Sequence, residues 1–303
     1  MTTFDAPLEH TTELALEEKA KLKKALRRFD MVFFTLCALV GLDTLGAVAA
    51  YGPEGFFWLA VMAITFVGPY MLIMSEVGSS FTEEGGPYEW VKLAFSRFQG
   101  GIAAVVYWAS NPFWIGGSLA FIASAAWSAS DLPALGVDHL GSFGDFVFKG
   151  LFIWFSIIVA IVSIEKGKWI PNAGAIARLL VLGFFTFTLV VYASKHGVEG
   201  FALSDMKPTW AVFLGLAPLI LFNYVGFELQ NGAAEEMVNP KRDVPISVLR
   251  SGTLGVLLYC VPVLGILLVL PTSDITGIGG FIDAVKTTFS VYGGAQDALF
   301  VVA

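Results

Sequence analysis

The sequence predicts an all-α integral membrane protein with about seven spanning helices and the start of an eighth. Of its 303 residues, 56% are hydrophobic and only 14% are charged, and its mean hydropathy is +0.74. Both values lie far from those of soluble globular domains. Apolar runs of about 20 residues, the length that crosses about 30 Å of hydrocarbon, recur along the chain. A multi-pass membrane protein follows.

Residues 1–30 are expected to form a cytoplasmic amphipathic segment. Six cations lie between Lys19 and Arg28, and no cleavable signal pattern is present. The first apolar run, 31–51, is longer than the apolar core of a signal peptide, so we expect it to remain in the membrane as span one.

Further apolar runs predict the other spans, and the last of them is incomplete. They lie at 56–75, 102–130, 146–164, 170–194, 210–233 and 251–270. An eighth run begins near Ala295, and the sequence ends within it. We therefore expect the chain to be truncated at its C-terminal end.

The distribution of cations predicts a cytoplasmic N-terminus, and we expect the protein to lie in the plasma or inner membrane. With that orientation, thirteen Lys and Arg residues fall inside, four fall outside and Arg178 falls within span five, as the positive-inside rule requires. The thirteen are Lys19, Lys21, Lys23, Lys24, Arg27, Arg28, Lys92, Arg97, Lys166, Lys168, Lys241, Arg242 and Arg250.

Span one contains a polar segment, GLDTLG, from Gly41 to Gly46. At a helix rise of about 1.5 Å per residue, Asp43 lies about 18 Å from the start of the span, which is too deep for snorkelling. One interpretation is an unwound break in which Gly41, Thr44 and Gly46 bind substrate and Asp43 pairs with a cation. The other is a kinked helix whose Asp43 is protonated or bonded to a neighbour. The cost of an unpaired carboxylate favours the first.

Span six contains a second interruption, within residues 219–236. We expect Phe222, Asn223 and Gly226 to bind substrate there and Glu228 to act in gating or coupling. Glu228 is only about 9 Å from a helix end near Ala234 if the segment is helical, so a role as a boundary residue is equally compatible with the sequence.

Two further polar groups lie within spans. Arg178 is about 12 Å from the start of span five, so it either snorkels to the cytoplasm or pairs with Asp43 or another partner in the core. Asn111 and Trp114 of span three are candidates for a pocket wall, although a kink at Pro112 with tryptophan packing is the plainer interpretation.

Spans one and six begin about 180 residues apart, and both carry glycines near their centres. In transporters built from inverted repeats, the discontinuous helices occupy corresponding positions and surround a site near the midplane. The spacing therefore indicates five helices per repeat.

Two segments resemble the amino acid–polyamine–organocation transporters, most closely amino acid permeases and glutamate/GABA-antiporter-like members. They are PYMLIMSEVGSSFTEEGGPYEWVKLAF (Pro69–Phe95) and GFELQNGAAEEMVNPKRDVP (Gly226–Pro245). The resemblance implies a leucine-transporter-type bundle of two inverted five-helix repeats working by alternating access. Residues 31–194 would form the first repeat, and 195–303 would begin the second. It also implies a gating or proton-linked role for Glu228.

The chain departs from that family pattern at two positions. GLDTLG has fewer glycines than the usual break, and an anionic Asp43 would repel a substrate carboxylate and attract an amine. Arg178 falls near a lysine of proton-coupled relatives, and an arginine does not readily release a proton. Exchange or facilitated transport is therefore favoured over lysine-mediated proton coupling.

These observations predict a secondary transporter of amino acids or related amines. The alternative is a sensor with a transporter fold that binds amino acids without flux. A seven-helix receptor conflicts with the cation count, and no enzyme motif is present. We expect a small-molecule substrate, lipids and a proton or exchange substrate as partners, with no nucleic acid, cofactor or metal. Cys37 and Cys260 lie in apolar runs and are expected to serve packing.

Overall fold

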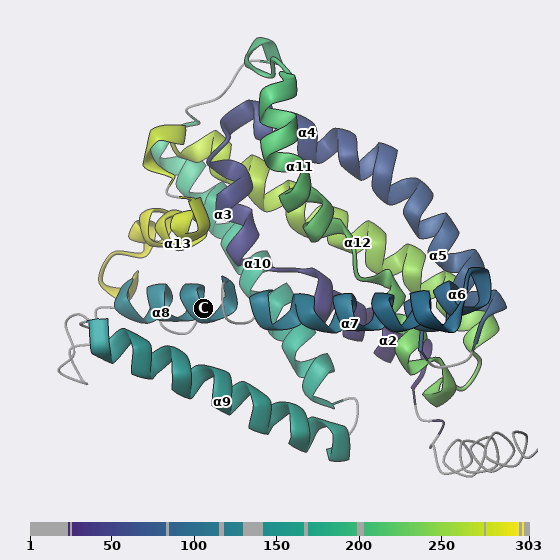
Figure 1. Ribbon diagram of the computed structural model, residues 1–303. Helices are drawn as coiled ribbons and strands as arrows, with labels where there is room; N and C mark the ends of the chain where they lie inside the picture. Colours follow the sequence, from purple (N-terminus) through teal and green to yellow (C-terminus); the bar gives the residue numbers. More distant parts are fainter. Residues whose placement is uncertain are drawn as a thin grey trace, which may run out of the picture.

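The computed structural model is helical, as predicted (Figure 1). It describes residues 24, 26–82, 85–114, 118–129, 142–166, 169–198, 203–275, 277–296 and 299. Within this part of the chain, the one pairing of extended backbone is a parallel bridge between Leu26 and Met237. Residues 1–23 and most of the expected eighth run lie outside the described residues.

The described residues up to His196 contain helices α2 to α10. The first two, α2 (Arg28–Leu39) and α3 (Asp43–Ala49), are bent by 56° at a short break. A long helix follows, formed by α4 (Gly52–Met62), the π-helical turn η1 (Ala63–Val67) and α5 (Gly68–Ser80). The others are α6 (Pro87–Ala94), α7 (Arg97–Trp114), α8 (Ala120–Ala129), α9 (Ser142–Lys166) and α10 (Trp169–His196).

The C-terminal part contains three α-helices and several 3-10 segments. The α-helices are α11 (Trp210–Tyr224), α12 (Pro240–Val269) and α13 (Gly280–Phe289). The 3-10 segments are η4 (Leu203–Asp205), η5 (Phe227–Glu236), η6 (Thr272–Asp274), η7 (Gly277–Gly279) and η8 (Ser290–Ala295).

Among the described residues, four helices are long and apolar enough to cross a membrane, or five when the bent pair counts as one. They coincide with the expected spans at 31–51, 56–75, 170–194, 210–233 and 251–270. The expected spans at 102–130 and 146–164 fall on α7, α8 and α9, which are not among these candidates. The count of seven therefore remains a prediction.

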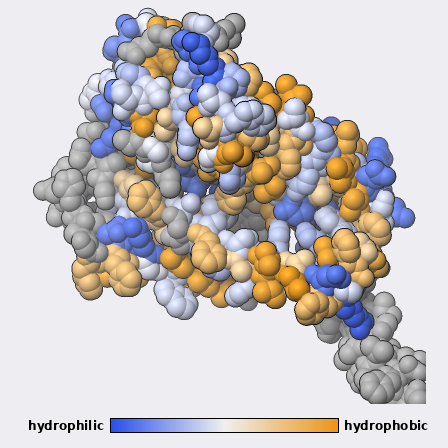
Figure 2. Space-filling model, turned by 45° about the horizontal axis from the view of Figure 1, so that its top comes forward, coloured by the Kyte–Doolittle hydropathy of each residue, from blue (hydrophilic) through white to orange (hydrophobic). Residues whose placement is uncertain are grey.

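Helix α12 is the centre of the packing, because it contacts α2, α3, α5 and α10. Its Val248, Tyr259, Val263 and Ile266 are at most 1% exposed. Large apolar side chains are instead exposed on the outer helices α5, α7, α9 and α10, and Figure 2 shows hydrophobic residues spread over the molecular surface. An apolar exterior of this extent suits contact with lipid.

At one end of the bundle, backbone and ionic contacts join the start of α2 to the segment from the end of η5 to the first turn of α12. Leu26 N–H donates to the carbonyl of Glu236 at 3.0 Å, and Val238 N–H donates to the carbonyl of Leu26 at 3.1 Å. Arg28 forms an ion pair with Asp243 at 2.7 Å. These contacts join the segment before α2 to the start of α12.

A buried polar network lies just inside that end. Gln230 of η5 is fully buried, and its amide nitrogen donates to Thr35 Oγ1 of α2 at 2.8 Å and to Ser251 Oγ of α12 at 3.4 Å. Ser247 donates to the amide oxygen of Gln230. Because each member has partners, the network specifies how α2, η5 and α12 are placed.

Gly46 lies inside α3, where this helix meets the backbone of α13 and η7. A Cβ at residue 46 would lie 2.4 Å from the nitrogen of Phe281 and 2.8 Å from the carbonyl oxygen of Gly277. Backbone atoms cannot move aside as a flexible side chain can, so the close approach of these segments requires glycine here.

We predict that Gly46→Ala lowers the free energy of unfolding by about 2–3 kcal/mol, because overpacking against backbone shifts two elements. The measurement is the thermal stability of the full-length protein in detergent. Gly183→Ala in α10 is the control, since a Cβ there meets open space and should be neutral or stabilising. Equal stability of the two variants would contradict the packing role.

Candidate functional site

The first feature of the site is the break in span one. Helix α2 ends at Leu39, Val40 is extended (φ −83°, ψ 102°), and α3 begins at Asp43. The unwound residues are thus 40–42 rather than the whole segment from Gly41 to Gly46, since the sequence from Asp43 onward is helical. A break of this kind leaves backbone N–H and C=O groups without helical partners.

Tyr259 of α12 binds both sides of this break. Its hydroxyl accepts a hydrogen bond from Gly41 N–H at 2.9 Å and donates to the carbonyl of Leu39 at 2.7 Å. The Tyr259 side chain is 1% exposed. A single buried hydroxyl therefore satisfies a donor and an acceptor of the interrupted helix, which would otherwise be costly at this depth.

Asp43 lies directly behind the break and is 2% exposed. Neither of its carboxylate oxygens has a hydrogen-bond partner among the described residues. The side chains of Ser118 and Trp114 act on the carboxylate as hydrogen-bonding groups, and Arg178 acts on it through its charge. None of the three reaches full hydrogen-bond geometry with a carboxylate oxygen. A buried carboxylate without a direct hydrogen bond or ion pair is costly, so Asp43 is a candidate to pair with a cation.

The side chain of Asp43 folds over Gly41. A Cβ at residue 41 would lie 2.5 Å from Asp43 Oδ1, so the absence of a side chain at this position gives the carboxylate its room. Thr44 Oγ1 donates to the carbonyl of Gly41 at 3.2 Å and thereby satisfies another backbone group of the break.

The second feature is the break in span six. Helix α11 ends at Tyr224, Val225 is extended (φ −100°, ψ 160°) and Gly226 has φ 128°. This left-handed conformation favours glycine, and it separates α11 from the 3-10 segment η5. Both spans that the sequence marks as interrupted are therefore discontinuous in the structure.

Glu228 lies just after this second break, and three uncharged donors bind its carboxylate. Tyr70 of α5 donates to Oε2 at 2.7 Å, Gly226 N–H donates to the same oxygen at 3.0 Å, and Tyr107 of α7 donates to Oε1 at 3.2 Å. None of the ion pairs in the described part of the chain includes Glu228.

A cavity of about 720 Å³ connects the two breaks, a size that suits a small-molecule ligand. Its lining comprises Phe34, Ala38, Leu39, Gly41, Tyr70, Met74, Pro87, Trp90, Val91, Tyr107, Ser110, Asn111, Trp114, Phe222, Val225, Gly226, Glu228 and Leu229. No lysine, arginine or histidine is among these described residues, so Glu228 gives the cavity wall its only formal charge.

Six of the residues singled out from the sequence line this cavity, and five do not. Those that line it are Gly41, Asn111, Trp114, Phe222, Gly226 and Glu228. Asp43 and Thr44 lie next to the lining residue Gly41, whereas Gly46 lies in the contact with α13. Sequence reasoning did not find Tyr70, Tyr107 or Tyr259, although hydroxyl-bearing aromatics within apolar runs were a visible signal.

Asn223 and Arg178 lie outside the cavity wall. Asn223 in the last turn of α11 is fully buried, and neither atom of its amide has a hydrogen-bond partner among the described residues. Arg178 Nη1 donates to the carbonyl of Leu36 in the last turn of α2, at 3.5 Å. Of the partners considered for Arg178, the structure therefore gives it a backbone carbonyl at the end of a helix, where a cation is favourable.

We predict that Tyr259→Phe lowers the free energy of unfolding by about 2–4 kcal/mol, because Gly41 N–H and the Leu39 carbonyl both lose their buried partner. The readout is the melting temperature of the full-length protein in detergent. Tyr51→Phe is the matched control, because Tyr51 is 44% exposed. A stability loss no larger than that of the control would show that the break does not depend on Tyr259.

Comparison with known proteins gives one family and several relatives. The sequence profile of the family described as "Amino acid permease" matches residues 26–303. The chain is 29% identical over 266 residues to the probable agmatine/putrescine antiporter AguD of Lactococcus lactis, covering 86% of this chain and 55% of AguD.

Two further relatives give the same coverage pattern. The chain is 29% identical to an uncharacterized transporter of Legionella pneumophila, covering 89% of this chain and 58% of the relative. It is 26% identical to the branched-chain amino acid permease BcaP of Bacillus subtilis, covering 81% and 55%. The chain thus spans little more than half the length of these relatives.

Proposed function

Because this chain belongs to the amino acid permease family, we propose that the whole protein is a secondary transporter of amino acids or related amines, working by alternating access. The family consists of membrane transporters and not of enzymes. The single observation that carries the proposal is the cavity between two interrupted helices, since discontinuous helices supply backbone groups for ligands at membrane depth.

The charges around the cavity favour a substrate that carries an amine. Glu228 lines the cavity and is bound only by uncharged donors, and the unpartnered carboxylate of Asp43 lies behind Gly41. With no basic residue in the lining, an ammonium group in the cavity would meet the carboxylate of Glu228 directly. The carboxylate of Asp43 lies just behind the wall, where the charge of Arg178 also acts on it. AguD is named for agmatine and putrescine, which are amines of this kind.

The aromatic residues of the cavity support the same substrate class. Tyr70, Tyr107, Trp90 and Trp114 all line it, and aromatic faces attract ammonium groups and accommodate an aliphatic stem. We propose that the amine lies between the two breaks, near Gly41 and Gly226, with its charge directed to a carboxylate.

We predict that Glu228→Gln and Asp43→Asn each raise the KM for agmatine or putrescine uptake about tenfold to 100-fold, because a hydrogen bond to a charged group contributes about 1.5–3 kcal/mol. Uptake of labelled substrate is measured with the full-length protein in proteoliposomes. Leucine uptake, included because BcaP is a branched-chain permease, should respond less.

Glu76→Gln is the matched control, since Glu76 lies on α5 but is exposed and outside the cavity lining. An unchanged KM for the cationic amine in Asp43→Asn would remove the amine-pairing role of Asp43. Saturable binding without any flux would favour the sensor alternative over a transporter.

The proposed transporter has two inverted five-helix repeats. Residues 31–194 would form the first repeat, and 195–303 would begin the second, after a cytoplasmic N-terminal segment at 1–30. The correspondence of the two breaks supports this division, because spans one and six occupy equivalent positions in such repeats.

We further propose that transport proceeds by exchange or facilitated diffusion. Arg178 lies beside the end of α2, and its charge acts on Asp43. Because a guanidinium does not release its proton at physiological pH, Arg178 provides a permanent charge where a lysine could serve as a proton carrier.

We predict that an imposed pH gradient does not drive substrate accumulation by the full-length protein, whereas internal substrate stimulates uptake. The measurement is uptake in proteoliposomes with and without the gradient, and with and without internal amine. Strong proton-driven accumulation that persists in Glu228→Gln and disappears in Arg178→Ala would contradict the role given to Arg178.

A further inference from the structure

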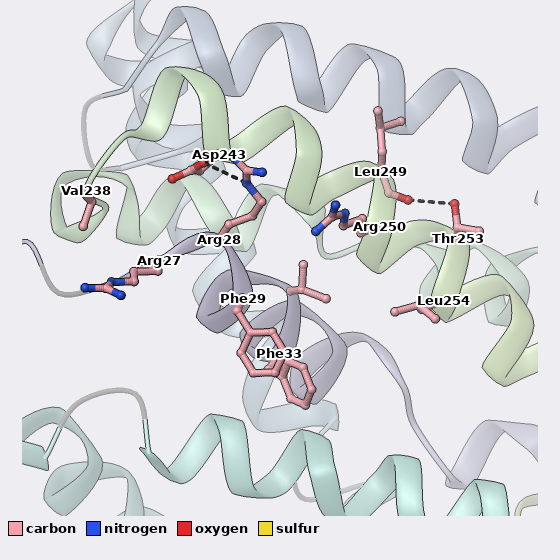
Figure 3. A pocket seen from close by; sticks show the side chains of 11 residues that line it. Arg27, Arg28, Phe29, Phe33, Val238, Asp243, Leu249, Arg250, Thr253 and Leu254 are labelled. Atoms are coloured by element: carbon pink, nitrogen blue, oxygen red, sulfur yellow. Dashed lines mark hydrogen bonds and ion pairs between the residues drawn. The ribbon is translucent and has the colours of Figure 1, made fainter.

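A second cavity, of about 1,040 Å³, lies between the start of α2 and the first half of α12. It shares no lining residue with the cavity at Glu228. Figure 3 shows its side chains, with arginines from both helices and a group of apolar residues. They are Arg27, Arg28, Phe29, Val32, Phe33, Val238, Asp243, Leu249, Arg250, Thr253 and Leu254.

The charge of this groove is positive. Arg28 is neutralised by Asp243, which accepts from its Nη2 at 2.7 Å and from its Nε at 3.0 Å. Arg27 and Arg250 are exposed, and in the described part of the chain neither guanidinium has a hydrogen bond or ion pair. Figure 3 shows Arg250 extending from α12 toward the start of α2. Two unpaired positive charges therefore remain.

The apolar part of the groove is open. Phe29 is 64% exposed, and its ring lies 4.3 Å from that of Phe33. Leu249 and Leu254 of α12 are 41% and 39% exposed. Figure 3 shows the two phenylalanines pointing away from the Arg28–Asp243 pair, so the groove has a polar end and an apolar side.

The sequence places this groove at the membrane boundary. Arg27 and Arg28 precede the apolar run 31–51, and Arg250 directly precedes the run 251–270. The same orientation argument that predicts a cytoplasmic N-terminus assigns all three to the cytoplasmic side. That leaflet carries anionic headgroups, which basic pockets between helices bind.

We propose that this groove binds an anionic glycerophospholipid, with its phosphate at Arg250, additional attraction from Arg27 and an acyl chain along Phe29, Phe33 and Leu254. A soluble phosphate would use only the polar end. A lipid matches both the charge and the exposed apolar side chains, and its headgroup lies at the depth where these arginines begin their spans.

A lipid in this position would contact α2, which ends at the break in span one, and α12, which binds that break through Tyr259. Helix α2 ends at Leu39, and α12 carries Tyr259, whose hydroxyl binds Leu39 and Gly41. The lipid would add to the Arg28–Asp243 pair and to the backbone pairing at Leu26. The proposal thus makes an anionic lipid a stabilising ligand of the end of the bundle where the start of α2 meets α12.

The test measures binding of phosphatidylglycerol, phosphatidylcholine and inorganic phosphate to the full-length protein in detergent, by native mass spectrometry and thermal shift. We expect phosphatidylglycerol to bind and to raise the melting temperature, and phosphatidylcholine and phosphate not to do so. The affinity for phosphatidylglycerol should fall about fivefold in Arg250→Gln, because each arginine near the headgroups contributes about fivefold. It should fall about 25-fold when Arg27→Gln is combined with Arg250→Gln.

Arg250→Lys should retain most of the affinity because it keeps the charge, and Leu254→Ser should weaken lipid binding. Arg242→Gln is the matched control, since Arg242 is an exposed arginine of α12 outside the groove. Equal phosphatidylglycerol binding by the wild type and the double arginine variant overturns the proposal. Equally tight binding of inorganic phosphate also overturns it. Lipid binding seen only after deletion of residues 1–22 overturns it as well, because it would indicate that the chain's own N-terminal segment fills the groove.

Discussion

The structure depends on one constraint, which is that an interrupted membrane helix must satisfy the backbone groups that the interruption frees. In span one, the hydroxyl of Tyr259 performs this role for Leu39 and Gly41 together. In span six, Gly226 adopts a left-handed conformation and gives its N–H to Glu228. The break in span one is satisfied by a residue of a helix distant in sequence, and the break in span six by a residue two positions away. Only the second interaction is local in sequence.

That difference explains how much of the site could be predicted. The glycines of both breaks and the carboxylates of Asp43 and Glu228 are conspicuous in apolar runs, and both interruptions appear in the structure. Tyr259 lies more than 200 residues from the break that it binds, so no spacing argument could connect them. Gly46 looks like part of the break in sequence, but its contacts with Gly277 and Phe281 identify a close helix approach, which depends on tertiary packing.

The fold itself was predictable to a similar degree. Hydropathy located five apolar runs that coincide with candidate spans. Helix α7 is harder to assign, because Ser110, Asn111 and Pro112 interrupt its apolar pattern, and Ser110 and Asn111 line the cavity. Helix α8 has only 10 residues, which is too short to cross a membrane by itself. Polar residues that line a cavity lower the hydropathy of the helix that carries them, so the cavity lining and the membrane signal oppose each other in α7.

The environment of Glu228 has a consequence for how the proposed amine site would select among cations. Tyr70, Tyr107 and the Gly226 N–H orient the carboxylate without neutralising it, so an entering cation does not have to displace a resident one. The negative potential at this wall is therefore preorganised. Folding has already removed part of the water around the Glu228 carboxylate, so a ligand does not bear that cost again when it binds. Discrimination between cations would then follow from their size and hydration. Added salt would lower the rate at which cations associate with the site more than it would weaken their binding once bound.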